Sequence, residues 1–206
     1  METKFDPKKT ALLVIDMQND LAKTGPDYFA PLYQMVQSNN VIGNFTKVVK
    51  GARERGLPII HIKTVHRKDN ADVVPTVTDF MLQGLVPKEM PPILTEGTPG
   101  ADFIEELQPA TEDYVVAKRR SGAFYNTDLD LFLRTRGIDT LIVGGVVTNG
   151  CVENTIRGAR ERDYHVIVLS DCCAAVVAQA HDHAINNVFP GLGRVRASDE
   201  VLEVMK

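Results

Sequence analysis

Cysteine and tryptophan are scarce in this chain. Its 206 residues include three cysteines and no tryptophan. Cys172 and Cys173 are adjacent and are therefore poorly placed to form a disulfide with each other. An odd number of cysteines also leaves at least one thiol unpaired. We therefore expect no disulfide framework. Reduced thiols are typical of cytoplasmic proteins, so we expect a cytoplasmic location.

Excess positive charge and long hydrophobic runs are also lacking. Lys and Arg number 23 against 27 Asp and Glu, which gives a net charge of −4. Nucleic acids and anionic membranes bind concentrated basic faces, so we expect neither as a partner. No window of about 20 apolar residues is present to span a bilayer, and the amino-terminal residues lack the apolar segment of a signal peptide. The sequence predicts a soluble protein that stays inside the cell.

The overall composition is that of an ordinary globular protein, with 44% hydrophobic and 24% charged residues. A domain of this length buries roughly 70% of the surface that its unfolded chain exposes, which suffices for a full core. We expect a single domain over residues 1–206.

Short apolar runs rich in β-branched residues alternate with helical patterns. Continuous rather than alternating hydrophobicity indicates strands that are covered on both faces. The predicted strands cover residues 11–15, 58–62, 114–117, 140–144, 165–169 and 193–196. The predicted helices cover residues 40–55, 127–136, 149–162, 174–187 and 198–205, and Gly56 and Gly137 follow the first two as carboxyl-terminal caps. This alternation predicts an α/β fold in which helices cover both faces of a parallel sheet.

Two segments interrupt the alternation, residues 18–37 after the first strand and residues 64–99 after the second. Both leave from carboxyl ends of strands, where ligands bind in open parallel sheets. They are therefore candidate walls or lids of a pocket, with surface elaboration as the alternative.

Three ionisable side chains follow separate strands, and a parallel sheet brings such positions together. Asp16 follows the first strand, Lys118 follows the third, and Cys151 lies at the start of the helix after the fourth. A helix amino terminus and a nearby ammonium lower the pKa of a thiol, and a carboxylate can take its proton. The pattern therefore indicates a nucleophile, a base and an electrostatic partner. Taken singly, each residue is better explained by a structural role.

Several motifs make the chain resemble the isochorismatase-like cysteine hydrolases. They are GGVVTNGCVE at residues 144–153, LVIDMQND at residues 13–20 and KRRSGAF at residues 118–124, with shorter matches at residues 97–101, 127–130 and 171–174. The resemblance implies a three-layer α/β sandwich with a parallel six-stranded sheet, assembled as a homodimer or homotetramer. It also implies that Asp16, Lys118 and Cys151 form the catalytic triad of the family.

The resemblance further implies a cis peptide bond that does not involve proline, between Val146 and Val147. In the family this bond turns the Val147 N–H toward the same point as the Cys151 N–H. Those two backbone donors form an oxyanion hole.

Family members that have the cysteine are mostly amide, ureide or carbamoyl hydrolases, whereas those that cleave a vinyl ether generally lack it. The resemblance therefore implies cleavage of a C–N bond in a small molecule, through a thioester and with release of ammonia. A vinyl-ether hydrolase and a binding or scaffold protein without catalysis remain alternatives. Residues 144–150 lack the spacing of a phosphate-binding loop, and burial is a better explanation for Cys172 and Cys173 than redox sensing.

Five residues are candidates for contact with the substrate. A guanidinium suits a carboxylate in the substrate, and Arg120 shares the face of Lys118 if the strand continues. Solvated surface charge is an equal alternative for both arginines, and core packing is an equal alternative for the aromatic pair. The candidates are Gln18, Arg119, Arg120, Phe124 and Tyr125.

The histidines do not match the metal-binding pattern of the nicotinamidase-like relatives. His61 and His66 are five residues apart, which places them on opposite faces of an extended strand. His181 and His183 point in divergent directions on a helix. We expect no metal and no cofactor.

Overall fold

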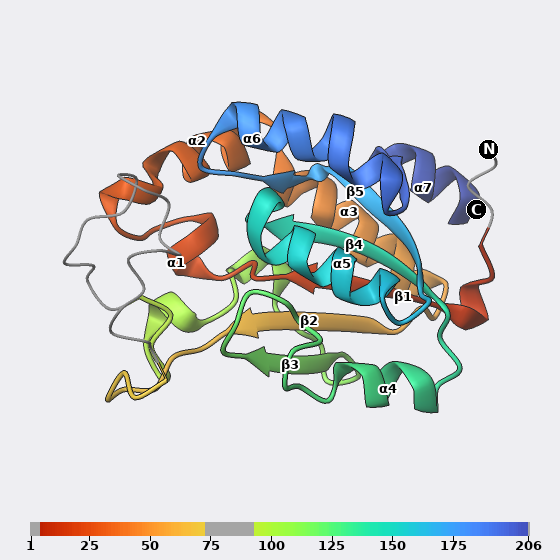
Figure 1. Cartoon of the computed structure of the whole chain (residues 1–206), viewed down its shortest axis with the longest axis horizontal. Helices are drawn as coiled ribbons and strands as arrows, with labels where there is room; N and C mark the ends of the chain where they lie inside the picture. The colour runs from red at the N-terminus through yellow and green to blue at the C-terminus, as the bar shows by residue number, and fades with distance from the viewer. Residues whose placement is uncertain (1–4, 73–92, 206) are drawn as a thin grey trace.

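The computed structural model describes residues 5–72 and 93–205, and one parallel six-stranded sheet forms its centre (Figure 1). The strands lie in the order β3-β2-β1-β4-β5-β6. Their bounds are β1 Thr10–Ile15, β2 Ile59–Thr64, β3 Tyr114–Lys118, β4 Thr140–Val146, β5 His165–Ala174 and β6 Arg194–Arg196. The strand positions and the parallel sheet confirm the predicted α/β class.

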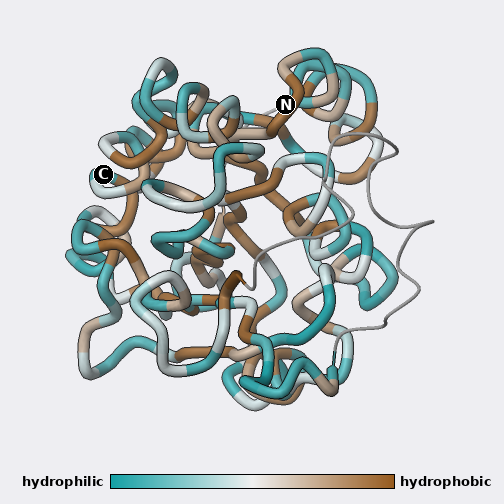
Figure 2. Tube along the Cα trace, turned by 90° about the vertical axis from the view of Figure 1, so that its left-hand side faces the viewer, coloured by the Kyte–Doolittle hydropathy of each residue, from teal (hydrophilic) through white to brown (hydrophobic). Residues whose placement is uncertain are grey.

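Burial along the strands explains their composition. Every residue of β1 and β4 is buried, because these strands lie in the middle of the sheet with layers on both faces. The edge strand β3 alternates instead, with Val115 and Ala117 exposed and Val116 and Lys118 buried. Figure 2 shows hydrophobic stretches of the chain running through the interior of the molecule.

Two hydrophobic clusters form the layers above and below the sheet. One packs α1 Asn19–Ala22, α2 Ala30–Ser38, α3 Val41–Glu54 and α7 Ser198–Met205 against one face. The other packs α4 Leu129–Thr135 and α5 Glu153–Arg160 against the opposite face. The three-layer arrangement implied by the resemblance is thus present.

Most helix ends fall where the sequence predicts them. Gly56 and Gly137 have φ of 67° and 64°, the left-handed conformation expected of glycines that end α3 and α4. The predicted helix at 174–187 is wrong at its start, because β5 continues to Ala174 and α6 covers only Ala178–His183. The extra strand residues include Cys172 and Cys173, which are fully buried beside β4.

The first interrupting segment has more structure than the sequence suggested. Residues 18–37 contain α1, a short 3-10 helix at Asp27–Phe29 and most of α2. Leu32 and Val36 of α2, one turn apart, are buried against the core. Much of the second segment, residues 73–92, lies outside the described residues.

None of the helices in residues 5–72 and 93–205 combines the length and the apolar character needed to cross a membrane.

Candidate active site

The candidate site lies where the strand order reverses. From β1 the chain continues to β2 and β3 on one side of β1, and it then crosses back to form β4 on the other side. The carboxyl ends of β1 and β4 therefore border a crevice. Asp16 follows β1 directly, with a φ of 52° and its N–H bonded to the Ile62 carbonyl at 2.8 Å. Aspartate and asparagine tolerate this left-handed conformation better than most residues. The backbone therefore turns sharply at Asp16, which is fully buried.

Lys118 ends β3, and its ammonium contacts the other two expected residues, Asp16 and Cys151. Its Nζ lies 2.7 Å from Asp16 Oδ2 and 3.4 Å from Cys151 Sγ. A third contact, at 2.6 Å, is with Thr64 Oγ1. A lysine ammonium has three N–H groups, so each has an acceptor here. The structure brings together Asp16, Lys118 and Cys151 from three strand ends, as the sequence predicts.

Thr64 belongs to this cluster and was missed by the sequence analysis. It ends β2, pairs in register with Lys118 and donates its hydroxyl to Asp16 Oδ1 at 3.2 Å. A weak signal is present, since Thr64 lies two residues past the apolar run that ends at Ile62. A neutral hydroxyl gives a weaker sequence signal for catalysis than an ionisable group does.

The environment of the thiol differs from the expectation. Burial, together with the Asp16 carboxylate, raises the pKa of Cys151 to about 12, although Lys118 opposes this rise. Burial and the carboxylate therefore outweigh the lowering of the thiol pKa that the sequence predicts from the helix start and the ammonium. Burial alone would lower the pKa of Lys118, but Asp16 and Cys151 raise it above its usual value. The site thus rests as a protonated thiol beside an ammonium–carboxylate pair.

The loop between β4 and α5 carries Cys151 on a π-helical turn, Thr148–Val152. The Val146–Val147 peptide bond before this turn is cis, at the position that the resemblance implies. The Cys151 carbonyl accepts the Thr155 hydroxyl at 2.7 Å, and Gly150 N–H donates to the Val147 carbonyl at 3.0 Å. Among the described residues, the Val147 N–H has no hydrogen-bond acceptor.

The Gln18 side chain bonds to the protein backbone, where the sequence predicts contact with the substrate. Its side chain is fully buried, and Nε2 donates to the carbonyls of Thr64 and Ala101 at 2.9 and 2.8 Å. Oε1 accepts the Thr64 N–H at 2.9 Å. Both amide hydrogens are therefore committed to the backbone, and Gln18 joins the end of β2 to the segment near Ala101.

The two arginines and Tyr125 lie apart from the reactive cluster. They line a hollow of about 310 Å³ together with Asp72, Ala117 and Asn126. Ala117 is exposed where its neighbour Lys118 is buried, so this hollow opens on the other face of β3. The strand ends at Lys118, and the shared face expected for Arg120 is therefore not formed.

Both guanidinium groups already have acceptors in the protein. Arg119 donates to the Val65 carbonyl at 2.8 Å, and Arg120 donates to the Asp72 carbonyl at 3.1 Å. Neither acceptor is Asp16, Thr64 or Cys151, although Val65 directly follows Thr64 in the chain. The alternative of surface charge describes both Arg119 and Arg120, which are exposed.

Phe124 is part of the core rather than a pocket wall. It is 7% exposed, and its ring lies 5.8 Å from that of Tyr164 between centroids. The absence of a side chain at Gly158 of α5 makes room for it. Core packing, the alternative for this residue, is what the structure shows.

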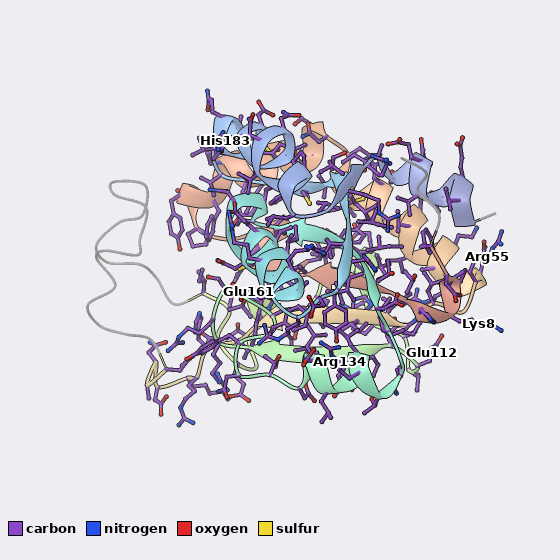
Figure 3. All side chains as sticks on the ribbon, turned by 45° about the vertical axis from the view of Figure 1, so that its right-hand side comes forward. Lys8, Arg55, Glu112, Arg134, Glu161 and His183 are labelled. Atoms are coloured by element: carbon purple, nitrogen blue, oxygen red, sulfur yellow. The ribbon has the colours of Figure 1, made fainter. Side chains whose placement is uncertain are left out.

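The histidines separate as the sequence indicated. His61 is fully buried, and its Nε2 lies 3.2 Å from Asp113 Oδ2, whereas His66 Nδ1 lies 2.9 Å from Asp72 Oδ2. His181 is buried, with its Nδ1 2.8 Å from Thr148 Oγ1, while His183 points outward (Figure 3). In the part of the chain that the structure describes, no three His, Cys, Asp or Glu residues gather as metal ligands.

Comparison with known proteins identifies the family. The family model of the isochorismatase domain matches residues 10–200. The chain belongs to the isochorismatase family. YwoC, an isochorismatase family protein of Bacillus subtilis, is 35% identical over 202 residues, which cover 98% of this chain and 97% of YwoC.

Two further similar proteins are named for a reaction. The ureidoacrylate amidohydrolase RutB of Acinetobacter baylyi is 31% identical over 197 residues, covering 92% of this chain and 80% of RutB. The N-carbamoylsarcosine amidase from Thermoplasma acidophilum superposes with a TM-score of 0.71 at 28% identity, covering 93% of this chain and 97% of that one. These comparisons confirm the family resemblance, and the chain is an isochorismatase family hydrolase.

Proposed function

We propose that this protein is a cysteine-dependent amidohydrolase that cleaves a C–N bond of a small amide, ureide or carbamoyl compound. The observation that carries the proposal is the contact of Lys118 Nζ with both Cys151 Sγ and Asp16 Oδ2. A scaffold protein needs no such buried arrangement of thiol, ammonium and carboxylate. RutB and N-carbamoylsarcosine amidase, both named for amide hydrolysis, support the same class of reaction.

The first half of the reaction forms a thioester. Cys151 Sγ attacks the substrate carbonyl carbon while Asp16 takes the thiol proton, since the resting thiol is protonated. The C–N bond then breaks, and Asp16 gives that proton to the departing nitrogen, which leaves as ammonia. Lys118 stabilises the developing charge on sulfur and the carboxylate in turn.

The second half restores the enzyme. Water attacks the thioester carbonyl and gives a proton to Asp16, and the thioester C–S bond breaks. Cys151 recovers its proton, and the product leaves as a carboxylic acid, or as a carbamic acid when the substrate is a ureide. Overall, one water is consumed and one ammonia is released for each bond cleaved.

The negative oxygen formed in each half needs donors that are already in place. We assign this role to the Val147 and Cys151 N–H groups, as the resemblance implies. The Val147 N–H, which has no acceptor among the described residues, supports the assignment. In other enzymes the loss of one such donor costs about 2.7 to 4 kcal/mol of transition-state stabilisation.

The proposal extends to the setting of the reaction. The substrate is a small molecule, with a carboxylate as one candidate feature, and the enzyme needs no metal, nucleic acid or membrane. Three free cysteines favour the cytoplasm. The family resemblance favours a homodimer or homotetramer.

Ammonia release from a panel of small amides, ureides and carbamoyl compounds tests the proposal. We expect at least one compound to be hydrolysed, and Cys151→Ala to lower kcat by about 10³-fold or more. Cys173→Ala, which removes a fully buried thiol outside the triad, is the control and should keep the activity. Equal rates for wild type and Cys151→Ala would favour a scaffold, and hydrolysis of an added vinyl-ether substrate without release of ammonia would favour the other hydrolase chemistry.

A further inference from the structure

The Lys118 ammonium is held by three acceptors, and Thr64 is the neutral one. Nζ lies 2.6 Å from Thr64 Oγ1, 2.7 Å from Asp16 Oδ2 and 3.4 Å from Cys151 Sγ. The Thr64 hydroxyl accepts one N–H of the ammonium and gives its own hydrogen to Asp16 Oδ1 at 3.2 Å. Both oxygens of the carboxylate therefore have a donor, and the third N–H is directed at the sulfur.

The hydroxyl is itself held firmly in place. Thr64 is 8% exposed and pairs in register with Lys118 across β2 and β3. Gln18 bonds to both the N–H and the carbonyl of Thr64, at 2.9 Å each. A side chain on a strand with both backbone groups committed has little freedom to move away from Nζ.

We propose that Thr64 is a positioning residue, whose hydroxyl directs one N–H of Lys118 toward Cys151 Sγ and holds the Asp16 carboxylate beside it. This inference rests on the proposed function for its effect on turnover, but its effect on the thiol is independent of any substrate. Thr64 acts through Lys118 and Asp16 and takes no proton from the substrate.

The chemistry explains why a hydroxyl is needed at this position. Valine has nearly the shape of threonine but offers no acceptor, so it would leave one buried N–H of Lys118 unpaired and Asp16 Oδ1 without its donor. The ammonium would then be held only by Asp16 and by the longer contact with Cys151, with one N–H unpaired, and would lose its fixed direction toward sulfur. Serine keeps the hydroxyl and loses only the methyl group.

The test compares Thr64→Val with Thr64→Ser in two assays. The first is the rate at which iodoacetamide alkylates Cys151, which needs no substrate. We expect Thr64→Val to slow this rate by about threefold or more, because the ammonium that favours the thiolate is no longer directed at sulfur, and Thr64→Ser to restore it. The second is kcat/KM for ammonia release, which should fall by about tenfold or more in Thr64→Val and stay near wild type in Thr64→Ser.

Thr140→Val is the matched control. Thr140 is also a buried strand threonine, but it begins β4 at the opposite end of the sheet. The Thr140→Val substitution should leave both the alkylation rate of Cys151 and the rate of ammonia release unchanged. If Thr64→Val does not fold, Thr64→Ala replaces it, since the smaller side chain also lacks the hydroxyl and adds no volume.

The two assays separate the possible failures. An alkylation rate in Thr64→Val equal to or above that of wild type overturns the positioning role, and so does a Thr64→Ser variant as impaired as Thr64→Val. If wild type hydrolyses nothing in the panel while alkylation follows the expected order, the proposed function fails and the positioning role stands.

Discussion

Lys118 Nζ and Asp16 Oδ2 lie 2.7 Å apart, and both side chains are fully inaccessible to solvent. Removing two charges from water is costly, so such a pair adds little net stability compared with apolar residues of the same volume. Each partner nevertheless depends on the other, because either charge left alone in this site is uncompensated. The pair is better explained by chemistry at Cys151 than by stability.

Asp16→Asn tests this dependence. It keeps the size of the side chain and tolerates the φ of 52°, so it removes mainly the charge. We expect the free energy of unfolding to fall by about 3 kcal/mol, because Lys118 remains as a buried unpaired cation. Urea denaturation of Asp16→Asn, Lys118→Met and the double variant measures the coupling. A double variant as destabilised as the sum of the singles would show that the two charges do not interact.

Alkylation of Cys151 should respond to these two variants in opposite directions. The Asp16 carboxylate contributes to the rise of the Cys151 pKa to about 12, and Lys118 opposes it. Asp16→Asn should therefore speed alkylation at neutral pH while abolishing ammonia release, and Lys118→Met should slow alkylation. Mass spectrometry of iodoacetamide-treated protein follows each site.

The other two thiols serve as internal references in that experiment. Cys172 and Cys173 are fully buried, whereas Cys151 is only partly so. Native protein should therefore be labelled at Cys151 well before the others. Equal labelling at all three cysteines would remove the case for a distinct reactive thiol.

Much of the fold could be predicted because the signals are local. The runs that became β1 and β4 are apolar throughout, and glycines mark the ends of α3 and α4. Strand ends in a parallel sheet meet at one edge, and this rule alone predicts that Asp16, Lys118 and Cys151 lie together. The start of α6 was not predictable in this way, because the strand-like continuation at Cys172 and Cys173 depends on pairing with β4.

The rest of the site depends on contacts that the sequence does not encode locally. The hydrogen bonds of Gln18 with the Thr64 backbone join residues 46 positions apart, and neither segment has a sequence pattern that predicts them. The raised pKa of Cys151 arises because burial and the Asp16 carboxylate together outweigh the effect of Lys118, and the spacing of these residues in the sequence does not reveal that balance. Phe124 became core because Gly158 leaves it room, which is a feature of packing and not of the aromatic side chain itself.

Gly145→Ala tests the close approach of β4 to β1 at the candidate site. Gly145 has a φ of 135°, and a Cβ there would lie 2.0 Å from the Ile15 carbonyl oxygen. That atom belongs to the backbone of a central strand and cannot move aside, so we expect a loss of more than about 3 kcal/mol in unfolding free energy, or no folded protein. Chemical denaturation measures the loss.

Gly191→Ala is the control for that substitution. Its φ is not positive, and a Cβ there would meet nothing within 4 Å. Its unfolding free energy should stay within about 0.5 kcal/mol of wild type. Similar stabilities for the two variants would contradict the steric argument at Gly145.

His61 should make the protein less stable as the pH falls from 6.5 to 4. Burial lowers the pKa of His61 to about 4 although Asp113 beside it opposes this, whereas the unfolded chain has a value near 6.5. Between these values the unfolded state binds a proton that the folded state does not, so acid favours unfolding. A pKa difference of this size between the folded and unfolded states corresponds to about 3 kcal/mol of folding stability. This stability is fully present above pH 6.5 and is lost by pH 4.

His61→Gln isolates this contribution. Its amide N–H can replace the His61 Nε2 contact with Asp113, and the side chain does not titrate. We expect urea denaturation at several pH values between 7 and 4 to show a shallower decline for His61→Gln than for wild type. His183→Gln, a change at an exposed histidine, should keep the wild-type slope. Parallel curves for His61→Gln and wild type would mean that the buried imidazole does not take up a proton on unfolding, and the pKa of His61 would then lie close to its value in the unfolded chain.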